Sequence, residues 1–452
     1  MRRPSLAETV ALLTFAGLIG IGDLFIGRDG DTLTHAVIGK DLLANGWPST
    51  DPLLAPEVPV QLHEWGYEVL LAAAGSLFGN AGYVLVGGFF VALTIGLVTR
   101  HIVIRAGAWP ALLLLTLALP SLLVHLHARP HVVSWCGIVV LVLLLDHARE
   151  HEPTTRFPLL AGTLGVVWAN LHGGFLIAPF VWAAFAVDSL RRPSRGLWIA
   201  GGFAFGIGTL LNPDGPWLHI HLIEFLSDSE IRASVQDLRP VSLLSRSGIP
   251  LIAWTLVGLF MLRRSPASHM VLTIVLAALT WRLLRNAPLY VLATAPLFAT
   301  SRGPAMFDES SSRVEAMFNR ISTMRWPLVL GLVAMAFAPL WSPELPREIL
   351  PVAAIDAHEA MELEGPGLVE FHWGGVVVHE RPTSRVFIHP LNALYPIERQ
   401  HDYVTLYAGD LTPLPASIEW SIIEPGTPLH EALDAEGWRT LHEDAVAVLM
   451  AR

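Results

Sequence analysis

The sequence predicts a mainly α-helical membrane protein that ends in a small α/β domain. Hydrophobic residues make up 53% of the 452 residues and charged residues only 15%, whereas a soluble domain usually carries about 25% charged residues. About eleven apolar runs have the length and composition of membrane passes. After residue 342 these runs stop and acidic residues become frequent. Residues 1–342 therefore form the predicted membrane domain, and residues 343–452 form the second domain.

Basic residues give the predicted helices an orientation. Fifteen lie in the loops on the N-terminal side of the membrane and eight in the opposite loops. By the positive-inside rule, the N-terminus is cytoplasmic. We expect the first run to be a retained helix, because no small-residue cleavage site follows it. The predicted helices span residues 6–22, 80–98, 108–124, 132–146, 157–171, 174–189, 197–211, 248–262, 269–283, 287–300 and 326–342.

Two outer loops are long, residues 23–79 and 212–247. The first ends in an amphipathic run from Tyr67 to Phe78, which predicts a helix lying along the membrane surface. The second begins with Asn212-Pro213-Asp214-Gly215, a strong turn signal. Clustered Asp, His, Asn and Trp residues lie in the loops on this outer side. One polar site at one membrane face is therefore predicted, as in an enzyme or a transporter.

The C-terminal domain is expected to be compact, extracytoplasmic and strongly acidic. Its 18 acidic and 6 basic residues leave a net charge of −12. This excess argues against a nucleic-acid partner and offers a docking surface for an envelope protein. Patterning predicts helices at 352–363 and 429–436 and strands at 368–371, 375–379, 385–388, 418–423 and 445–450.

Asp29-Gly30-Asp31 stands just beyond the first predicted helix. Two carboxylates at this spacing can bind a divalent cation, or one can act as general base while the other orients it. A solvated turn with Gly30 at the bend is the alternative. His35 follows four residues later and would share a face with Asp31 on a helix.

The third predicted helix ends in a run of histidines with one arginine, His125-Leu126-His127-Ala128-Arg129-Pro130-His131. Ionisable groups at a membrane boundary are candidates for function. Arg129 is suited to phosphate recognition. Zinc would need a carboxylate from another loop, because no cysteine is near. Snorkelling toward the interface is the plain alternative.

Two further outer clusters complete the set. Asn170-Leu171-His172-Gly173-Gly174 interrupts an apolar region. Either its glycines allow a break that faces a cavity, or it is a simple turn between helices. Arg282 and Arg285 lie about one turn apart, a fork that suits a phosphate; end-of-helix snorkelling is the alternative.

No GxxxxGK[ST] loop and no GxSxG motif occurs. Cys136 is the only cysteine, so no intrachain disulfide can form.

Several of these motifs together resemble the GT-C superfamily of integral-membrane glycosyltransferases, which use polyprenyl-phosphate sugars. More narrowly, the chain resembles a group of bacterial multi-pass proteins with GT-C-like architecture. The resemblance covers nearly the whole chain. It is carried by Asp31 with His35, Gly46-Trp47-Pro48, Asp51-Pro52, His63-Glu64-Trp65, Arg129-Pro130-His131, Asn170 to Gly174, Asn212-Pro213, Arg285-Asn286, Trp373-Gly374-Gly375, Val386-Phe387-Ile388 and Glu443-Asp444.

The resemblance implies a catalytic carboxylate in the first outer loop, so Asp29 or Asp31 would deprotonate or position the acceptor. From their charge, the arginines would hold the donor phosphate. One departure stands out: in the group, an Asp-Gly-Arg triplet usually follows the strand around Phe387, and here His389-Pro390-Leu391 replaces it. The candidate substrate-binding residues are His35, His63, Glu64, Arg129, His131, Asn170, His172, Arg282 and Arg285.

The expected function is transfer of a sugar from a lipid-phosphate donor to an acceptor at the outer face of a bacterial cytoplasmic membrane. The expected partners are the lipid-linked sugar and membrane lipids. A cation at Asp29 and Asp31 stays open as cofactor. Two other functions compete with this one. A transporter or flippase of lipid-linked saccharides would need matching inner-face sites, and the short cytoplasmic loops show none. A non-catalytic envelope assembly factor would use the acidic C-terminal domain as its docking surface.

Overall fold

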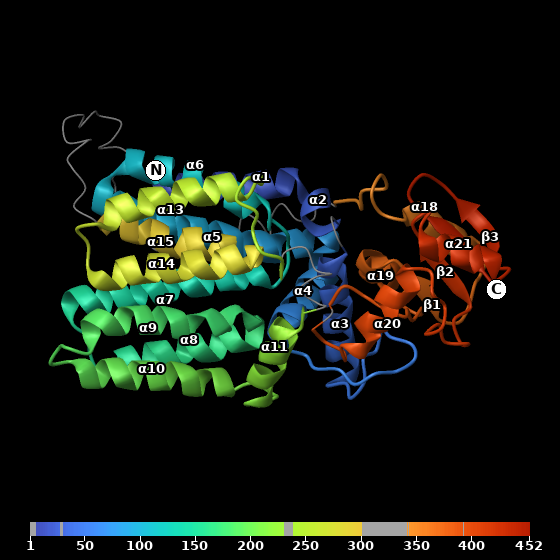
Figure 1. Cartoon of the computed structure of the whole chain (residues 1–452), viewed down its shortest axis with the longest axis horizontal. Coiled ribbons are helices and arrows are strands. Elements are labelled where there is room, and N and C mark those ends of the chain that lie inside the picture. Colours follow the sequence, from blue (N-terminus) through green and yellow to red (C-terminus); the bar gives the residue numbers. More distant parts are fainter. Residues whose placement is uncertain (1–5, 28–29, 230–237, 301–340, 342, 392) are drawn as a thin grey trace.

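The computed structural model describes residues 6–27, 30–229, 238–300, 341, 343–391 and 393–452. Most of this part is helical, and it contains one small sheet. Long helices lie side by side in a bundle, and the C-terminal α/β region lies beyond one end of that bundle (Figure 1). We call this the outer end.

The bundle helices correspond to ten of the predicted passes. They are α1 (Leu6–Gly20), α5 (Asn80–Ala106), α6 (Ala108–Leu123), α7 (His131–His151), α8 (Phe157–Leu171), α9 (Ala178–Ser189), α10 (Arg195–Leu210), α13 (Gly248–Leu262), α14 (Ala267–Arg282) and α15 (Ala287–Thr300). The predicted helix at 326–342 lies outside the described residues except for Trp341. Within the described residues, α5 and α7 are long and apolar enough to cross a membrane, and further apolar helices are shorter. The count of about eleven passes stays a prediction.

Glycines let the backbones of two bundle helices approach closely. A Cβ on Gly165 of α8 would meet the carbonyl oxygen of Phe205 at 2.4 Å, and one on Gly208 of α10 would meet that of Gly162 at 2.4 Å. Small residues at helix contacts are the usual solution where lipid surrounds the helices. Here they fix α8 against α10.

Shorter helices cover the outer end of the bundle (Figure 1). They are α2 (Gly22–Gly27), α3 (Asp31–Asn45), α4 (Trp65–Phe78) and α11 (Trp217–Ser227). Helix α4 confirms the helix predicted from the amphipathic run. Helices α3 and α11 had no prediction of their own. Gly39 of α3 lies against the backbone of Glu68 in α4, where an added Cβ would be 2.0 Å from the carbonyl oxygen. The two helices thus pack as one unit.

The C-terminal region contains α18 (Val352–Ala360), β1 (Gly367–Val369), η5 (Phe371–Trp373), α19 (Gly374–Glu380), α20 (Glu398–Tyr407), β2 (Trp420–Ile423), α21 (Pro428–Ala435), β3 (Arg439–Glu443) and β4 (Val448–Ala451). The strand order is β1-β2-β4-β3. Strand β1 is parallel to β2, and the other pairs are antiparallel. Of the predicted strands, those near 368, 418 and 445 are confirmed.

Two of the predicted strands are wrong. Residues 375–379 form helix α19, in which Val376, Val377 and Val378 are all buried. A β-branched run buried on every side has no periodicity that separates strand from helix. Residues 385–388 form only isolated bridges through Val386.

The first outer loop makes backbone contacts at the edge of this sheet. Val386 bridges in parallel to Gly367 of β1 and to Leu54 of the first outer loop. The amide of Ala55 donates to the carbonyl of Val386 at 3.0 Å, and the amide of Val386 donates to that of Leu53 at 2.9 Å. Isolated backbone bridges through Val386 therefore join the first outer loop to the edge of the C-terminal sheet.

A second junction joins α19 to α3. A Cβ on Gly375 would lie 2.0 Å from Thr34 Oγ1 and 2.3 Å from the carbonyl oxygen of Gly30. No side chain fits there without displacing the first turn of α3, the turn that carries Asp31.

Candidate active site

Asp31 and Arg129 meet at the outer end of the bundle. Asp31 Oδ2 lies 2.9 Å from Arg129 Nη1, and their side chains are 13% and 27% exposed. A charged pair that is only partly solvated keeps more of its attraction than a surface pair does. The structure thus places a carboxylate of the first outer loop against an arginine of another loop, and the roles expected for the two residues stay predictions.

Local backbone geometry places Asp31. Gly30 precedes α3 with φ of 73°, a left-handed conformation that glycine adopts without strain. An added Cβ there would also lie 2.6 Å from the carbonyl oxygen of His372. Asp31 thus starts the helix, where the helix dipole favours a negative charge. Asp29 lies outside the described residues.

Backbone contacts hold the segment that carries Arg129. The amide of Ala128 donates to Phe25 at 2.9 Å, and the Tyr67 hydroxyl donates to the carbonyl of Ala128 at 3.0 Å. His131 Nε2 lies 2.7 Å from the carbonyl oxygen of His125. His131 therefore supports this turn, and among the described residues no hydrogen bond or ion pair joins it to Glu64.

Glu64 is the centre of a buried histidine cluster. His172 Nε2 and His63 Nε2 lie 3.3 Å and 3.6 Å from Glu64 Oε1, and His35 Nε2 lies 3.5 Å from Glu64 Oε2. On its other side, His35 Nδ1 lies 3.1 Å from Glu68 Oε1. Residues 35, 63, 64 and 172 were predicted separately, and the structure brings all four together.

Hydrogen bonds fix the tautomer of His172. Its Nδ1 accepts from the amide of Gly174 at 2.9 Å and lies 2.6 Å from Ser134 Oγ, which accepts from Trp168 Nε1 at 2.7 Å. Since an amide can only donate, Nδ1 is an acceptor and the proton of the neutral ring is on Nε2, facing Glu64. Only glycine fits at position 174, where a Cβ would be 2.3 Å from Ser134 Oγ. The segment joins α8 to α9 through the short helix η1 (Gly173–Ile177), which is the simple connection between helices; the cavity considered for Asn170 and His172 stays a prediction.

Burial sets the protonation of this cluster, which lies outside the spanning helices. Desolvation raises the pKa of Glu64 to about 7 and that of Glu68 to about 8. It also lowers the pKa of His35 to about 4 and that of His63 to about 3, and holds the pKa of His172 well below its usual value. Near neutral pH the three rings are uncharged, and Glu64 is poised to gain or lose a proton.

Of Arg282 and Arg285, it is Arg285 whose charge changes the pKa values in this cluster. After desolvation, its positive charge contributes to the low pKa of His172 and, more weakly, to that of His63, and it favours the anionic form of Glu64. Arg282 is exposed at the end of α14, and no hydrogen bond or ion pair among the described residues links it to the cluster. The expectation that both would act as one fork is not supported.

Asn170 has a structural task. Its Nδ2 donates to the carbonyls of Val166 and Leu211, both at 2.8 Å, and its Oδ1 accepts from Trp65 Nε1 at 3.0 Å. These bonds tie the end of α8 to α4 and to the end of α10. Asn170 thus holds the neighbouring Glu64 segment in place.

A second buried pair joins the C-terminal region to the first outer loop. His389 Nε2 lies 2.9 Å from Asp51 Oδ2, and both side chains are fully buried. The amide of Leu391 donates to His389 Nδ1, so the Nε2 proton points at Asp51. The segment that departs from the Asp-Gly-Arg pattern therefore packs against the first outer loop.

Sequence reasoning missed Glu68, Ser134 and His389. Glu68 lies in the helix predicted from Tyr67 to Phe78, four residues after Glu64, and extending that helix by one turn would put both on one face; a signal was therefore present. Nothing local marks Ser134 or His389, because their partners are distant in sequence.

The described residues contain no group of three or more His, Cys, Asp or Glu that could hold a metal ion. The Asp31 carboxylate is shared with Arg129, which competes with a cation for the same oxygen. Asp29 lies outside the described residues, so a divalent cation at Asp29 and Asp31 stays a proposal.

A scan of family models gives no match, and neither does a search of curated proteins. Solved structures do match. ArnT from Cupriavidus metallidurans bound to undecaprenyl phosphate aligns with a TM-score of 0.55 and 13% identity over 99% of this chain and 97% of that chain. The Archaeoglobus fulgidus oligosaccharyltransferase in complex with Zn and sulfate gives a TM-score of 0.59 and 12% identity, over 92% and 68%.

Arabinofuranosyltransferase AftD from Mycobacteria aligns with a TM-score of 0.53 and 17% identity, over 99% of this chain and 39% of that chain. At such identities the likeness shows the fold alone. These neighbours are GT-C glycosyltransferases. The helical bundle with its capping outer helices, loops and C-terminal α/β region is therefore a GT-C-like fold.

Proposed function

We propose that the protein is a membrane glycosyltransferase that moves a sugar from a polyprenyl-phosphate donor to an acceptor at the outer membrane face. The observation that carries this proposal is the meeting of Asp31 with Arg129 at the end of the bundle that also holds the Glu64 cluster. Carboxyl groups and arginines brought together from separate loops supply what phosphate-linked sugar transfer needs.

In this mechanism Arg129 and Arg285 hold the donor phosphate. Guanidinium groups stabilise the charge that collects on a phosphate as it leaves. Asp31 holds Arg129 in place through their ion pair and positions the acceptor beside the donor. The acceptor hydroxyl loses its proton to a carboxylate of the first outer loop as its oxygen bonds to the anomeric carbon. The bond from that carbon to the phosphate oxygen breaks, and the polyprenyl phosphate leaves with the electron pair.

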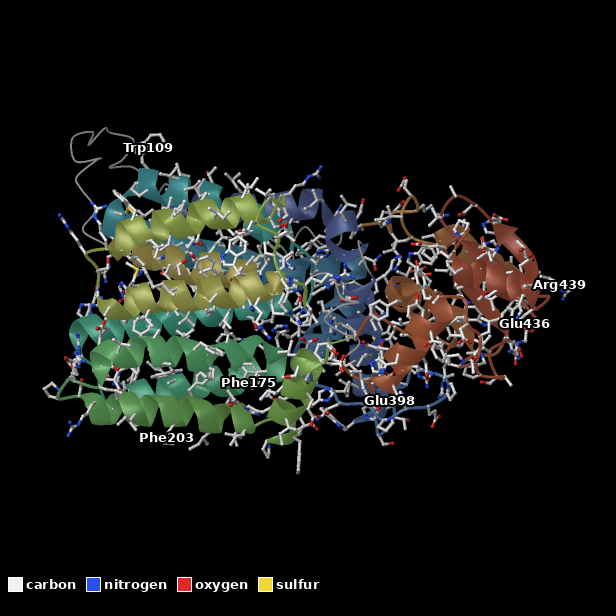
Figure 2. The ribbon with its side chains drawn as sticks, viewed as in Figure 1. Trp109, Phe175, Phe203, Glu398, Glu436 and Arg439 are labelled. Atoms are coloured by element: carbon white, nitrogen blue, oxygen red, sulfur yellow. The ribbon has the colours of Figure 1, made fainter. Side chains whose placement is uncertain are left out.

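The lipid tail of the donor has a candidate groove. A cavity of about 710 Å³ with mainly apolar walls lies between α9 and α10, and its lining includes Phe175, Trp182, Gly206 and His219. Phe175 lies toward α11 at the outer end, and the exposed Phe203 lies at the outside of α10 (Figure 2). Since η1 (Gly173–Ile177) directly follows His172, a lipid in this groove would have its head group near the Glu64 cluster.

Filling the groove should weaken donor binding. Gly206 lines it, and an added Cβ there meets nothing within 4 Å, so Gly206→Phe places a ring in the groove without a backbone clash. We expect binding of undecaprenyl phosphate to weaken by about 10-fold or more, as apolar contact is lost. Binding is measured with the protein in lipid nanodiscs.

Gly196→Phe is the matched control. Gly196 lies on the same helix, also has nothing within 4 Å of an added Cβ, and is not among the groove residues. Equal affinity in the Gly206→Phe and Gly196→Phe variants would remove the groove from the proposal.

We propose further that residues 1–342 form the membrane domain and residues 343–452 an extracytoplasmic domain of a bacterial inner-membrane protein. Supporting this, α1 begins at the end of the bundle away from the C-terminal region (Figure 1), and basic residues favour the N-terminal side. Labelling in intact cells of single cysteines, introduced at Gly196 or at Glu436 in a Cys136→Ser background, tests this. Outside labelling is expected only at position 436.

Transfer itself is tested with purified protein, a panel of undecaprenyl-phosphate monosaccharides and a cell-envelope glycan extract. Release of undecaprenyl phosphate that depends on the extract is the expected result. A protein that neither binds undecaprenyl phosphate nor releases it from any donor would overturn the proposal and favour an assembly factor. Adding EDTA, followed by Mg²⁺, Mn²⁺ or Zn²⁺, tests for a cation.

A further inference from the structure

Two glutamates follow the parallel strands of the C-terminal sheet, at the point where each strand ends. Glu370 comes directly after β1, and Glu424 comes directly after β2. The two strands are parallel neighbours, and the amide of Glu370 donates to the carbonyl of Ile422 at 3.0 Å. Both glutamates therefore leave the sheet at its carboxyl edge, where ligands of parallel α/β sheets usually bind.

Aromatic and imidazole side chains surround these two carboxyl groups. The Tyr403 hydroxyl donates to Glu370 Oε1 at 2.6 Å. The ring of Tyr407 lies 6.0 Å from that of Tyr403, centre to centre, and His372 Nε2 lies 3.8 Å from Glu424 Oε1. We call this group the Glu370 cluster; it consists of Glu370, His372, Tyr403, Tyr407 and Glu424.

The floor of the Glu370 cluster has an unsatisfied acceptor. Glu370 is 4% exposed, and its Oε2 has no hydrogen-bond partner among the described residues. The backbone amide of Glu424 favours the anion of Glu370 without making a hydrogen bond to Oε2. Buried polar atoms are almost always paired, with the protein or with a bound molecule such as water. The cluster therefore offers a buried acceptor to a polar ligand.

The rim of the Glu370 cluster is open to solvent. Tyr407 is 37% exposed, and the side chains of His372 and Glu424 are 41% and 43% exposed. A ligand thus approaches the carboxyl groups past an accessible aromatic ring. A flat apolar face beside a few polar groups suits a sugar ring, because its C–H face packs on the aromatic ring and its hydroxyls donate to the carboxyls.

The charges of the cluster select among ligands. Burial raises the pKa of Glu370 to about 7, against the hydrogen bond from Tyr403, and the charge of Glu424 adds to the rise. Burial lowers the pKa of His372, so this ring is neutral near pH 7. Among the described residues, the charges that act on Glu370 and His372 come from carboxylates. A phosphate or an acidic sugar would be repelled, whereas a neutral hydroxyl group can donate to either carboxyl.

The Glu370 cluster lies beside the start of α3. The carbonyl oxygen of His372 would be 2.6 Å from a Cβ on Gly30, the residue that precedes Asp31. Helix α19, which follows η5 directly, then packs on α3 at Gly375. A chain molecule bound at the cluster can therefore extend toward Asp31.

Resting on the proposed glycosyl transfer, we infer that the Glu370 cluster binds the acceptor and that this acceptor is a neutral saccharide. Tyr407 packs on the C–H face of one sugar unit, while Glu370 and Glu424 accept hydrogen bonds from its hydroxyls. The next unit then reaches the ion pair of Asp31 and Arg129. The cluster positions the acceptor and takes no part in the changes of bonding.

Tyr407→Ala removes the exposed ring and leaves the floor of the cluster in place. Binding is measured with the full-length protein in lipid nanodiscs on an array of neutral mannan, glucan and galactan oligosaccharides. We expect the affinity to fall by about 10-fold, because the stacked apolar area is lost. Val404→Ala is the matched control: Val404 lies on the same helix, is 52% exposed and is outside the cluster. It should bind as the wild type does.

Glu370→Gln tests the buried acceptor. Glutamine keeps the shape of the side chain and removes its charge, so affinity for the same oligosaccharides should fall by about 10-fold. Thermal unfolding checks the fold. Glu419→Gln is the control, since Glu419 is exposed and precedes β2 at the opposite end of the strand. In the transfer assay, Tyr407→Ala and Glu370→Gln should raise the KM for a saccharide acceptor and leave kcat and undecaprenyl-phosphate binding unchanged.

The possible results are distinguishable. A wild type that binds undecaprenyl phosphate but no neutral oligosaccharide, or oligosaccharide affinities that neither variant changes, overturns the acceptor site alone. Binding only to oligogalacturonate or to chitosan oligosaccharide, which stand on the same array as acidic and cationic probes, overturns the choice of a neutral saccharide. A wild type that binds neutral oligosaccharides but releases undecaprenyl phosphate from no donor removes the proposed transfer, and the acceptor role with it.

Discussion

Replacing Asp31 with asparagine should lower the rate of sugar transfer by about 100-fold, because it releases Arg129 from the position in which it meets the donor phosphate. Asparagine has the same shape and no charge, so the 2.9 Å ion pair is lost while α3 remains. Misplacing a catalytic contact by about 1 Å is enough to cost a factor of this size. The measurement is release of undecaprenyl phosphate, with thermal unfolding as the check on folding.

Asp41→Asn is the matched control for this variant. Asp41 lies on the same helix and accepts a hydrogen bond from Asn45 at 2.7 Å on the exposed side, so transfer should stay at the wild-type rate. The double variant Asp29→Asn, Asp31→Asn covers both carboxylates of the first outer loop. Wild-type transfer by that double variant would exclude both from the reaction.

Replacing Gly375 with valine should separate the C-terminal region from α3. The added atoms have no space beside Thr34 and the carbonyl of Gly30, and both belong to the turn that positions Asp31. Overpacking at a rigid contact costs about 1–3 kcal/mol, and here the backbone must move. We expect faster hydrogen exchange in residues 31–45 and transfer lowered by at least about 10-fold.

Gly20→Val is the control for that substitution, because a Cβ at Gly20 of α1 meets nothing within 4 Å. It should leave both the exchange rate and transfer unchanged. Wild-type exchange in the Gly375→Val variant would show that the junction does not hold α3.

Helix prediction succeeded because the apolar runs are long and are set apart by glycine, proline and charged residues. Ten expected passes correspond to helices, and helix α4 was recognised from its amphipathic run. Prediction failed for α19, where Val376 to Val378 are buried on all sides. Such a run is compatible with a helix and with a strand, and the packing of α19 against α3 at Gly375 is not visible in the local pattern.

The site could be predicted residue by residue but not as a geometry. Glu64 and His172 were recognised as polar groups at a membrane face, yet nothing in the sequence indicates that three imidazoles surround one carboxylate. Arg282 and Arg285 look equivalent in sequence. Arg285, in the short helix η3 (Leu284–Asn286), lies where its charge reaches the cluster, whereas Arg282 ends α14 and is exposed. Contacts between distant segments decide such cases, and local patterns carry no information on them.

The backbone bridge between Leu54 and Val386 has a practical consequence for making fragments of this protein. A piece cut at residue 343 would leave the amide and carbonyl of Val386 without the strand partner that the first outer loop supplies. Open strand edges recruit other chains, so such a fragment should self-associate on purification. A peptide covering residues 51–59, added in trans, should return it to a monomer.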